Sequence, residues 1–253
     1  MPLAALINKL HLYGRIYMIY GAILAGGIGR RMGNAEKPKQ FLNIGGKPII
    51  VHTVEKFVVC SEFEKIIVLT PKKWIEHTKN ILSRHLPDMS KIVVTEGGDT
   101  RNETLMNAID VIDKDGNLDE DTIIVTHDAV RPFVTYRIIS DNIEAAGRVG
   151  ACDTAFPATD TIVRSEDGKL IAEVPDRSQL FQGQTPQSFR AKKLRDLYRS
   201  LTDEEKDILT DAAKIFVMKG EDVEIVRGES FNIKITYPYD IKVAETILKG
   251  DIE

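Results

Sequence analysis

Cysteine and long apolar runs are scarce in this sequence of 253 residues. Its two cysteines, Cys60 and Cys152, lie far apart in the chain, which excludes a CxxC redox pair and suggests no zinc site. A chain without paired cysteines fits the reduced cytoplasm, and we expect it there. No segment is apolar over the length needed to span a membrane, and polar residues break the apolar start of residues 1–17 before it could serve as a signal peptide.

A cluster of charge of one sign is also missing. The 34 basic residues nearly balance the 38 acidic ones, and Lys and Arg form no continuous run. We therefore expect no nucleic-acid partner and no membrane-surface partner. With 43% hydrophobic residues the chain is able to bury a full core, and its length fits one domain with a small appendage.

The first residues stand outside the pattern of the rest. Met18 lies directly before the first expected strand, so residues 1–17 form an N-terminal extension of open status. It is a vector remnant, an upstream start or a native arm. Residues 18–253 form the main domain.

After Met18, short β-branched runs alternate with longer amphipathic stretches, which is typical of βα units. Strands are predicted at 19–25, 65–70, 91–95, 121–129, 149–156, 222–228 and 231–236. Helices are predicted at 47–59, 72–86, 100–111 and 136–148, within 201–220 and from near Pro238. Extended segments around Asp167 and Gly168 predict a hairpin arm at about 160–177. The predicted fold is therefore α/β and Rossmann-like, an open, mostly parallel sheet flanked by helices, with a projecting β-hairpin arm.

The loop after the first expected strand has the composition of a phosphate-binding loop. Its glycines, which allow the backbone to wrap closely around phosphates, are Gly26, Gly27 and Gly29. Its cations are Arg30, Arg31, Lys37 and Lys39. An ordinary Gly-rich turn with solvated charges is the alternative interpretation.

Two common glycine motifs do not fit this loop. A dinucleotide fingerprint needs a third glycine at the position of Met32. A P-loop needs a Ser or Thr after its Gly-Lys pair, but Gly46 and Lys47 are followed by Pro48. The loop therefore predicts phosphate binding of another kind.

Two further strand ends carry polar groups. The third expected strand is followed by Gly97, Gly98 and Asp99. Asp128 ends the fourth, where a carboxylate beside phosphates commonly holds a divalent metal, with a helix cap as the equal alternative. His127 is expected to pack or to hydrogen-bond, and Arg131 is placed to bind a phosphate.

All these strand ends are expected at one edge of one sheet, because the carboxyl ends of parallel strands meet there. A nucleoside triphosphate with magnesium would satisfy the glycines, the cations and the carboxylate together. Lys234, on the last expected strand, adds little by itself, because a lone lysine on a strand is usually solvated.

Nine segments occur in an order known from one family. They are LAGGIGRRM, PKQF, GGDTR, HDAVRPF, ATDTIV, DRSQL, QTPQ, LTDAA and NIKIT. In this order they resemble the polyol-phosphate cytidylyltransferases, and the match covers nearly everything after Met18. That group includes enzymes acting on 2-C-methyl-D-erythritol 4-phosphate in isoprenoid synthesis and enzymes acting on D-ribitol 5-phosphate for teichoic acid or capsular polymers.

The resemblance implies a CTP site, an acceptor site and a Mg²⁺ site. The implied CTP-binding residues are Leu24, Ala25, Gly26, Gly27, Arg31, Lys39, Gly98, Asp99, Arg101 and Thr104. The implied catalytic residues are Arg31, Lys39, Lys234 and Asp128, and Asp128 would also hold Mg²⁺. The implied acceptor-binding residues are Arg131, Thr161, Arg177, Thr210 and Lys234. The resemblance further implies a homodimer in which Arg177 and Thr210 complete the acceptor site of the neighbouring subunit.

Three departures within the group favour the ribitol branch. LAGG at Leu24–Gly27 replaces the PAAG usual in the erythritol enzymes, LFQGQTPQSF resembles the ribitol pattern, and LTDAAKIFVMKG differs from the TDDAS or TDEAS run. We therefore expect transfer of CMP from CTP to D-ribitol 5-phosphate, giving CDP-ribitol and pyrophosphate, with 2-C-methyl-D-erythritol 4-phosphate as the alternative acceptor. A non-catalytic nucleotide-binding protein would be expected to lose Lys39 or Asp128, and both are present.

Overall fold

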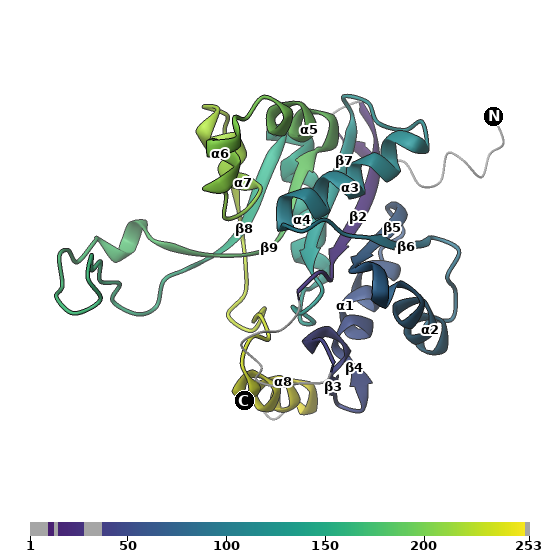
Figure 1. Cartoon of the computed structure of the whole chain (residues 1–253), viewed down its shortest axis with the longest axis horizontal. Coiled ribbons are helices and arrows are strands. Elements are labelled where there is room, and N and C mark those ends of the chain that lie inside the picture. Colours follow the sequence, from purple (N-terminus) through teal and green to yellow (C-terminus); the bar gives the residue numbers. More distant parts are fainter. Residues whose placement is uncertain (1–9, 13–14, 28–36, 251–253) are drawn as a thin grey trace.

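The computed structural model describes residues 10–12, 15–27 and 37–250 (Figure 1). An eight-stranded sheet has the order β10-β8-β9-β7-β2-β5-β6, and β1 (Leu10–Leu12) pairs with β2 (Arg15–Leu24). The parallel part consists of β2, β5 (Phe63–Thr70), β6 (Ile92–Glu96) and β7 (Thr122–Asp128). A second parallel pair is formed by β8 (Ala151–Pro157) and β10 (Glu224–Arg227), and β9 (Phe181–Arg190) joins the two parts by antiparallel pairing. The α/β, Rossmann-like, mostly parallel fold is confirmed.

Helices cover both faces of the sheet and form two apolar cores. One face carries α1 (Ile49–Val58), α2 (Ile75–His85) and α4 (Tyr136–Val149). The other carries α3 (Arg101–Lys114), α5 (Ala191–Arg199) and α7 (Ala213–Met218), with the short α6 (Asp203–Asp207) beside them. A third, smaller core joins α8 (Pro238–Lys249) to the short strands β3 (Asn43–Ile44) and β4 (Lys47–Pro48).

The strand prediction differs from the structure at several places, and the short strands β1, β3 and β4 were not predicted. The segment 231–236 forms no strand, because it crosses the end of β7 and donates only one backbone hydrogen bond there, from Ile235 to Val130, at 2.9 Å. The strand β9 was not predicted, because Gly183 and Pro186 interrupt the apolar alternation that marks a strand. The helix α5, which follows β9 directly, was also not predicted.

The predicted arm projects from the ends of β8 and β9, well away from the body of the molecule (Figure 1). Gly168 takes a left-handed conformation with φ +71°, as the hairpin turn requires, and one antiparallel bridge joins Arg164 to Glu173. The arm is therefore a loose hairpin rather than a regular two-stranded ribbon. Within the described residues, no helix is both long and apolar enough to cross a membrane.

Candidate active site

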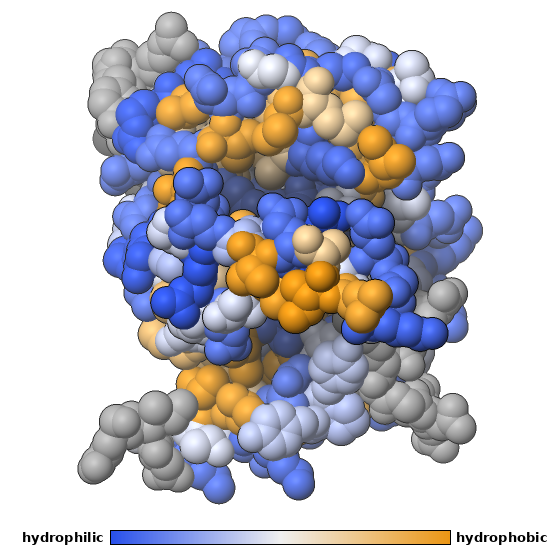
Figure 2. All heavy atoms as spheres, turned by 90° about the vertical axis from the view of Figure 1, so that its left-hand side faces the viewer, coloured by the Kyte–Doolittle hydropathy of each residue, from blue (hydrophilic) through white to orange (hydrophobic). Residues whose placement is uncertain are grey.

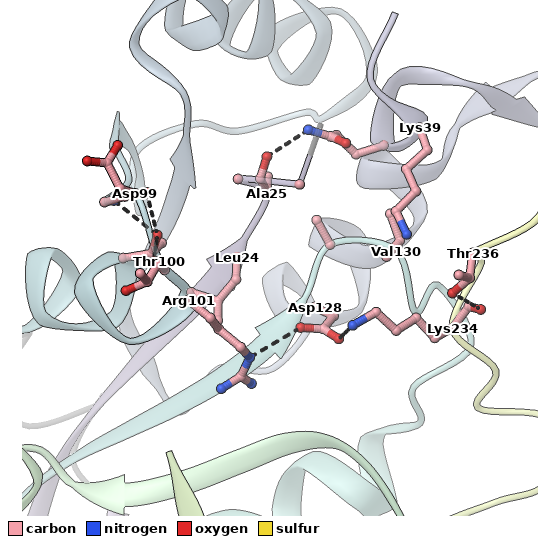
Figure 3. Close-up of a pocket in the computed structure, with 16 residues that line it drawn as sticks. Leu24, Ala25, Lys39, Asp99, Thr100, Arg101, Asp128, Val130, Lys234 and Thr236 are labelled. Atoms are coloured by element: carbon pink, nitrogen blue, oxygen red, sulfur yellow. Dashed lines mark hydrogen bonds and ion pairs between the residues drawn. The ribbon is translucent and has the colours of Figure 1, made fainter. Parts of the chain in front are cut away.

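A cavity of about 440 Å³ opens at the carboxyl edge of the parallel strands (Figure 3). The residues predicted to bind CTP or to act in catalysis that line it are Leu24, Ala25, Gly26, Gly27, Lys39, Gly98, Asp99, Arg101, Thr104, Asp128 and Lys234. They come from the ends of β2 and β7, the start of α3, and segments on either side. The structure thus brings together most of the residues that the sequence suggested.

One wall of the cavity is the turn between β6 and α3. The backbone N–H of Gly98 donates to Oγ1 of Thr104 at 3.0 Å, and that hydroxyl donates to the carbonyl of Thr100 at 2.8 Å. Thr100 and Glu103 form a capping box that fixes the start of α3. A Cβ atom added at Gly98 would lie 2.4 Å from Cβ of Glu103, so only glycine fits this close approach. The turn therefore holds its backbone amides beside the cavity.

The opposite wall carries a buried cation. Lys39, in a short 3-10 helix (Lys39–Phe41), is 8% exposed, and its Nζ donates to the carbonyl of Ile235 at 2.9 Å. The neighbouring Gln40 donates from Nε2 to the carbonyl of Ala25 at 2.7 Å, which ties this helix to the end of β2. These two hydrogen bonds fix the short helix, and with it Lys39, in the wall of the cavity.

The floor of the cavity is the carboxylate of Asp128, at the end of β7. Lys234 Nζ lies 2.8 Å from its Oδ2, and the Nε atoms of Arg101 and Arg131 each lie 3.8 Å from a carboxylate oxygen. Burial by itself would raise the pKa of Asp128, but Arg101, Lys234 and Arg131 outweigh it and hold that pKa well below its usual range. Asp128 is therefore an anion among three cations.

A buried network holds Asp128 in place. The hydroxyl of Thr185 lies 3.2 Å from the backbone N of Asp128, from which it accepts, and 2.9 Å from His127 Nδ1. His127 Nε2 lies 2.9 Å from the carbonyl of Arg131. Burial lowers the pKa of His127 to about 4, so the ring is neutral at pH 7, donating from Nε2 and accepting at Nδ1. This confirms His127 as a hydrogen-bonding residue, and Thr185, within the QTPQ segment, is a support that the sequence analysis missed.

A second polar group on the same face was also missed. In the register of the sheet, Asp153 on β8 lies opposite Gln187 on β9, and Gln187 lies opposite Thr126 on β7. Burial raises the pKa of Asp153 to about 7, and nearby Asp211 adds to the rise. The signal available in the sequence was a lone carboxylate inside the apolar strand GACDTAF.

The predicted acceptor residues are only partly assembled. Arg131 lies beside Asp128, and its Nη1 donates to the carbonyl of Asn232 at 2.8 Å. Thr161 and Arg177 lie on the projecting arm and are exposed, and Arg177 donates to the carbonyl of Thr159 at 2.8 Å. Thr210 is exposed beside α7, and Arg31 lies outside the described residues.

Comparisons with known proteins all point to the same family. The family model for 2-C-methyl-D-erythritol 4-phosphate cytidylyltransferase (IspD) matches residues 19–250. A similar solved structure is the 4-diphosphocytidyl-2C-methyl-D-erythritol synthase of Anaerococcus prevotii, with 27% identity, a TM-score of 0.76 and coverage of 92% of this chain and 96% of that chain. The 2-C-methyl-D-erythritol 4-phosphate cytidylyltransferase of Francisella tularensis has 30% identity, a TM-score of 0.74 and coverage of 90% and 98%. The enzyme of that name from Thermus thermophilus has 25% identity, a TM-score of 0.67 and coverage of 92% and 98%.

Proposed function

Because the chain belongs to the 2-C-methyl-D-erythritol 4-phosphate cytidylyltransferase family and is a nucleotidyltransferase, we propose that its cavity binds CTP and transfers CMP to a small polyol phosphate. The observation that carries this proposal is the convergence of a glycine loop, buried Lys39 and the Asp128–Lys234 pair around one cavity of about 440 Å³. Such a set of groups can neutralise the charge of a triphosphate, and its remaining cations can bind the phosphate of the acceptor.

The chemistry needs few groups from the protein. A phosphate oxygen of the acceptor attacks the α-phosphorus of CTP and forms a new P–O bond, while the bond to the β-phosphate oxygen breaks and its electron pair leaves with pyrophosphate. No general base is required, because a phosphate monoester is already an anion near pH 7. Lys39, Lys234 and Arg131 position the two phosphates and neutralise the charge that builds in the transition state.

The family is generally dependent on a divalent metal, and the cavity offers one partner for it. Among the described residues, no group of three or more His, Cys, Asp and Glu side chains is placed to hold a metal ion. Magnesium, however, is commonly held by one or two carboxylates together with substrate phosphates, and Asp128 fits such a site. Lys234 Nζ lies 2.8 Å from Oδ2 of that carboxylate, so magnesium and Lys234 would lie beside the same side chain. When bound, the ion would supply further charge neutralisation on the triphosphate.

Two acceptors are candidates. The comparisons support 2-C-methyl-D-erythritol 4-phosphate, which the family model and the similar structures name. The sequence departures support D-ribitol 5-phosphate. Leu24–Gly27 line the cavity. Gln184 donates to the carbonyl of Glu229 and accepts from Asn232, two residues before Lys234 in the chain. The departures at 212–216 include Ala212, Ile215 and Phe216 in the apolar core, so they carry little information about the acceptor.

One assay tests the proposal and separates the acceptors. Pyrophosphate release is measured with CTP and each polyol phosphate, and with ATP, GTP and UTP as controls for the base. We expect release with CTP and one of the two acceptors. Absence of release with both acceptors, or a preference for another nucleotide, would contradict cytidylyl transfer. The acceptor with the higher kcat/KM decides between the methylerythritol and the ribitol assignments.

The arm supports a homodimer with shared acceptor sites. It exposes the apolar side chains of Ile162, Val163, Leu170, Ile171 and Val174. Figure 2 shows apolar residues gathered on the side from which the arm projects. Exposed apolar patches of this kind are usually covered by a partner, and a second copy would bring Arg177 toward a site that its own subunit leaves incomplete. The cytoplasm remains our proposed compartment, in keeping with two buried free cysteines, Cys60 and Cys152.

A further inference from the structure

Beside Asp128, three neighbouring strands carry polar groups on one face of the sheet. Asp153 on β8 lies opposite Gln187 on β9, and Gln187 lies opposite Thr126, two residues before Asp128 on β7. Side chains two residues apart on a strand share a face, so Asp128, Gln187 and Asp153 form a row above the α3-covered core. Two strand spacings of about 4.8 Å separate β7 from β8, so the row extends about 10 Å from the reaction centre.

This row contains hydrogen-bonding atoms without partners among the described residues. Gln187 is 2% exposed, and its Oε1 accepts no hydrogen bond from any of them. The same holds for Oδ1 of Asp153, and two buried donors, Nη1 of Arg101 and Nε of Arg131, make no hydrogen bond to the described chain either. Both arginines act electrostatically on Asp153, so the four atoms belong to one neighbourhood. Buried polar atoms normally have partners, because each one left alone costs free energy.

We propose that Asp153 and Gln187 bind hydroxyl groups of the acceptor's polyol chain and so select polyol phosphates as acceptors. This inference rests on the proposed function. A hydroxyl group both donates and accepts, so neighbouring hydroxyls of one chain can donate to the carboxylate and amide oxygens and accept from the two guanidinium groups. With the acceptor phosphate beside Lys234 and Arg131, the polyol chain would extend along the row toward Asp153.

The protonation of Asp153 agrees with this assignment. Burial raises its pKa to about 7, and a side-chain hydrogen bond with Gln187, together with Arg101 and Arg131, compensates only part of that rise. Hydroxyl donors would stabilise the charged carboxylate and would therefore lower this pKa when the acceptor binds. An apolar or amide side chain at this position would fill the space without offering a charged acceptor to the hydroxyls.

Steady-state kinetics with Asp153→Ala and Gln187→Ala test the proposal. With the acceptor that the wild-type protein prefers, we expect each variant to raise the acceptor KM by about 10- to 100-fold. The KM for CTP should stay within about twofold, because the CTP-binding walls are untouched. An unchanged CTP KM also shows that the variant is folded. Asp222→Asn, which removes an exposed carboxylate before β10, is the matched control and should change neither KM.

An acceptor analogue with one chain hydroxyl replaced by hydrogen separates contact from a merely structural role. Wild-type protein should use this analogue as poorly as Asp153→Ala uses the complete acceptor, and the variant should lose nothing further with it. If replacing each hydroxyl in turn lowered activity by the same factor in the wild-type protein and in Asp153→Ala, the inference would be overturned. An active wild-type protein whose Asp153→Ala variant keeps its acceptor KM would also overturn it. Absence of pyrophosphate release from the wild-type protein would overturn the proposed function itself, and this inference with it.

Discussion

At the scale of single residues, the site is organised by the charge of Asp128. Three cations, Arg101, Arg131 and Lys234, surround this buried carboxylate and keep its pKa well below the usual range. Without the carboxylate, the cations would repel one another in a region of low dielectric. The same cations are available to phosphates once substrates enter. Asp128 therefore both orders the floor of the cavity and, on our proposal, holds magnesium.

Asp128→Asn is expected to lower kcat/KM for the acceptor by a factor corresponding to about 3 kcal/mol or more of transition-state stabilisation. The amide keeps the shape of the side chain but cannot offer an anion to Lys234 or to magnesium. Pyrophosphate release at saturating magnesium measures the effect, and thermal unfolding checks that the variant is folded. Near-normal turnover would remove Asp128 from the catalytic set.

Asp153 gives a prediction about pH. Its pKa is raised from the ordinary value of 3.8 to about 7 by burial and by Asp211, against the opposing effects of a side-chain hydrogen bond with Gln187 and of Arg101 and Arg131. Because the folded state favours the protonated carboxyl group, the contribution of Asp153 to the free energy of unfolding is fully present below about pH 4. This contribution is lost as pH rises through 7. Asp153→Asn should therefore become more stable relative to wild type between pH 5 and pH 8, by on the order of 2 to 4 kcal/mol.

Urea unfolding of both proteins at the two pH values measures this difference. Subtracting the wild-type free energy of unfolding from that of the variant cancels the titration of all other groups. Asp222→Asn, at an exposed position, should show no such change. A difference that does not grow with pH would mean that Asp153 is charged throughout and is fully compensated by its arginines.

At the scale of elements, the turn between β6 and α3 is the most constrained part of the cavity. The Thr100 capping box and the Thr104 hydroxyl fix its backbone, and the space above Gly98 is closed by Glu103. Two helix-cap interactions and one close approach thus place the backbone amides that line the cavity. The geometry of this wall of the cavity depends on the absence of a side chain at position 98.

Gly98→Ala should raise the KM for CTP and lower the thermal unfolding temperature. The added Cβ would lie 2.4 Å from Cβ of Glu103 and 2.8 Å from its backbone carbon, so the turn must move. A loss of about 1 to 3 kcal/mol in stability is typical of such overpacking. Gly27→Ala is the control for unfolding, because no atom of the described residues lies within 4 Å of its added Cβ. Equal unfolding temperatures for the two variants would contradict the close approach at Gly98.

At the scale of the whole molecule, we propose that the arm completes the acceptor site of a neighbouring subunit. Arg177 and Thr161 belong to this arm, which projects away from the body of the molecule (Figure 1), and neither lines the cavity. The arm has too little buried surface to be stable by itself, since its apolar residues are exposed. A partner subunit would cover these residues and receive Arg177.

Mixing inactive Arg177→Ala with inactive Lys39→Ala subunits is expected to restore activity. Random exchange makes about half of the dimers mixed, and each mixed dimer has one site with both residues, so recovery should approach about one quarter of wild type. Mixing Lys39→Ala with Asp128→Asn is the control and should restore nothing, because both residues line the cavity of one subunit. Mixed dimers that stay inactive, or an active monomer, would contradict shared sites.

The sequence by itself determined the parallel βα core and most of the cavity wall, because both depend on local patterns. β-branched runs and helical periodicity identify β2, β5, β6 and β7, and the glycines and cations follow directly after strand ends. Since carboxyl ends of parallel strands meet at one edge, Lys39, Gly98 and Asp128 could be placed together before the structure was known.

Only the tertiary structure decided the features that depend on pairing between distant segments. The strand β9 exists because β7 and β8 lie on either side of it, although Gly183 and Pro186 give it a weak local signal. The segment carrying Lys234 was expected to be a strand, but it crosses the sheet edge, where it meets Asp128. The row from Asp128 to Asp153 likewise depends on the register of three strands, and no local pattern in the sequence specifies a register between strands.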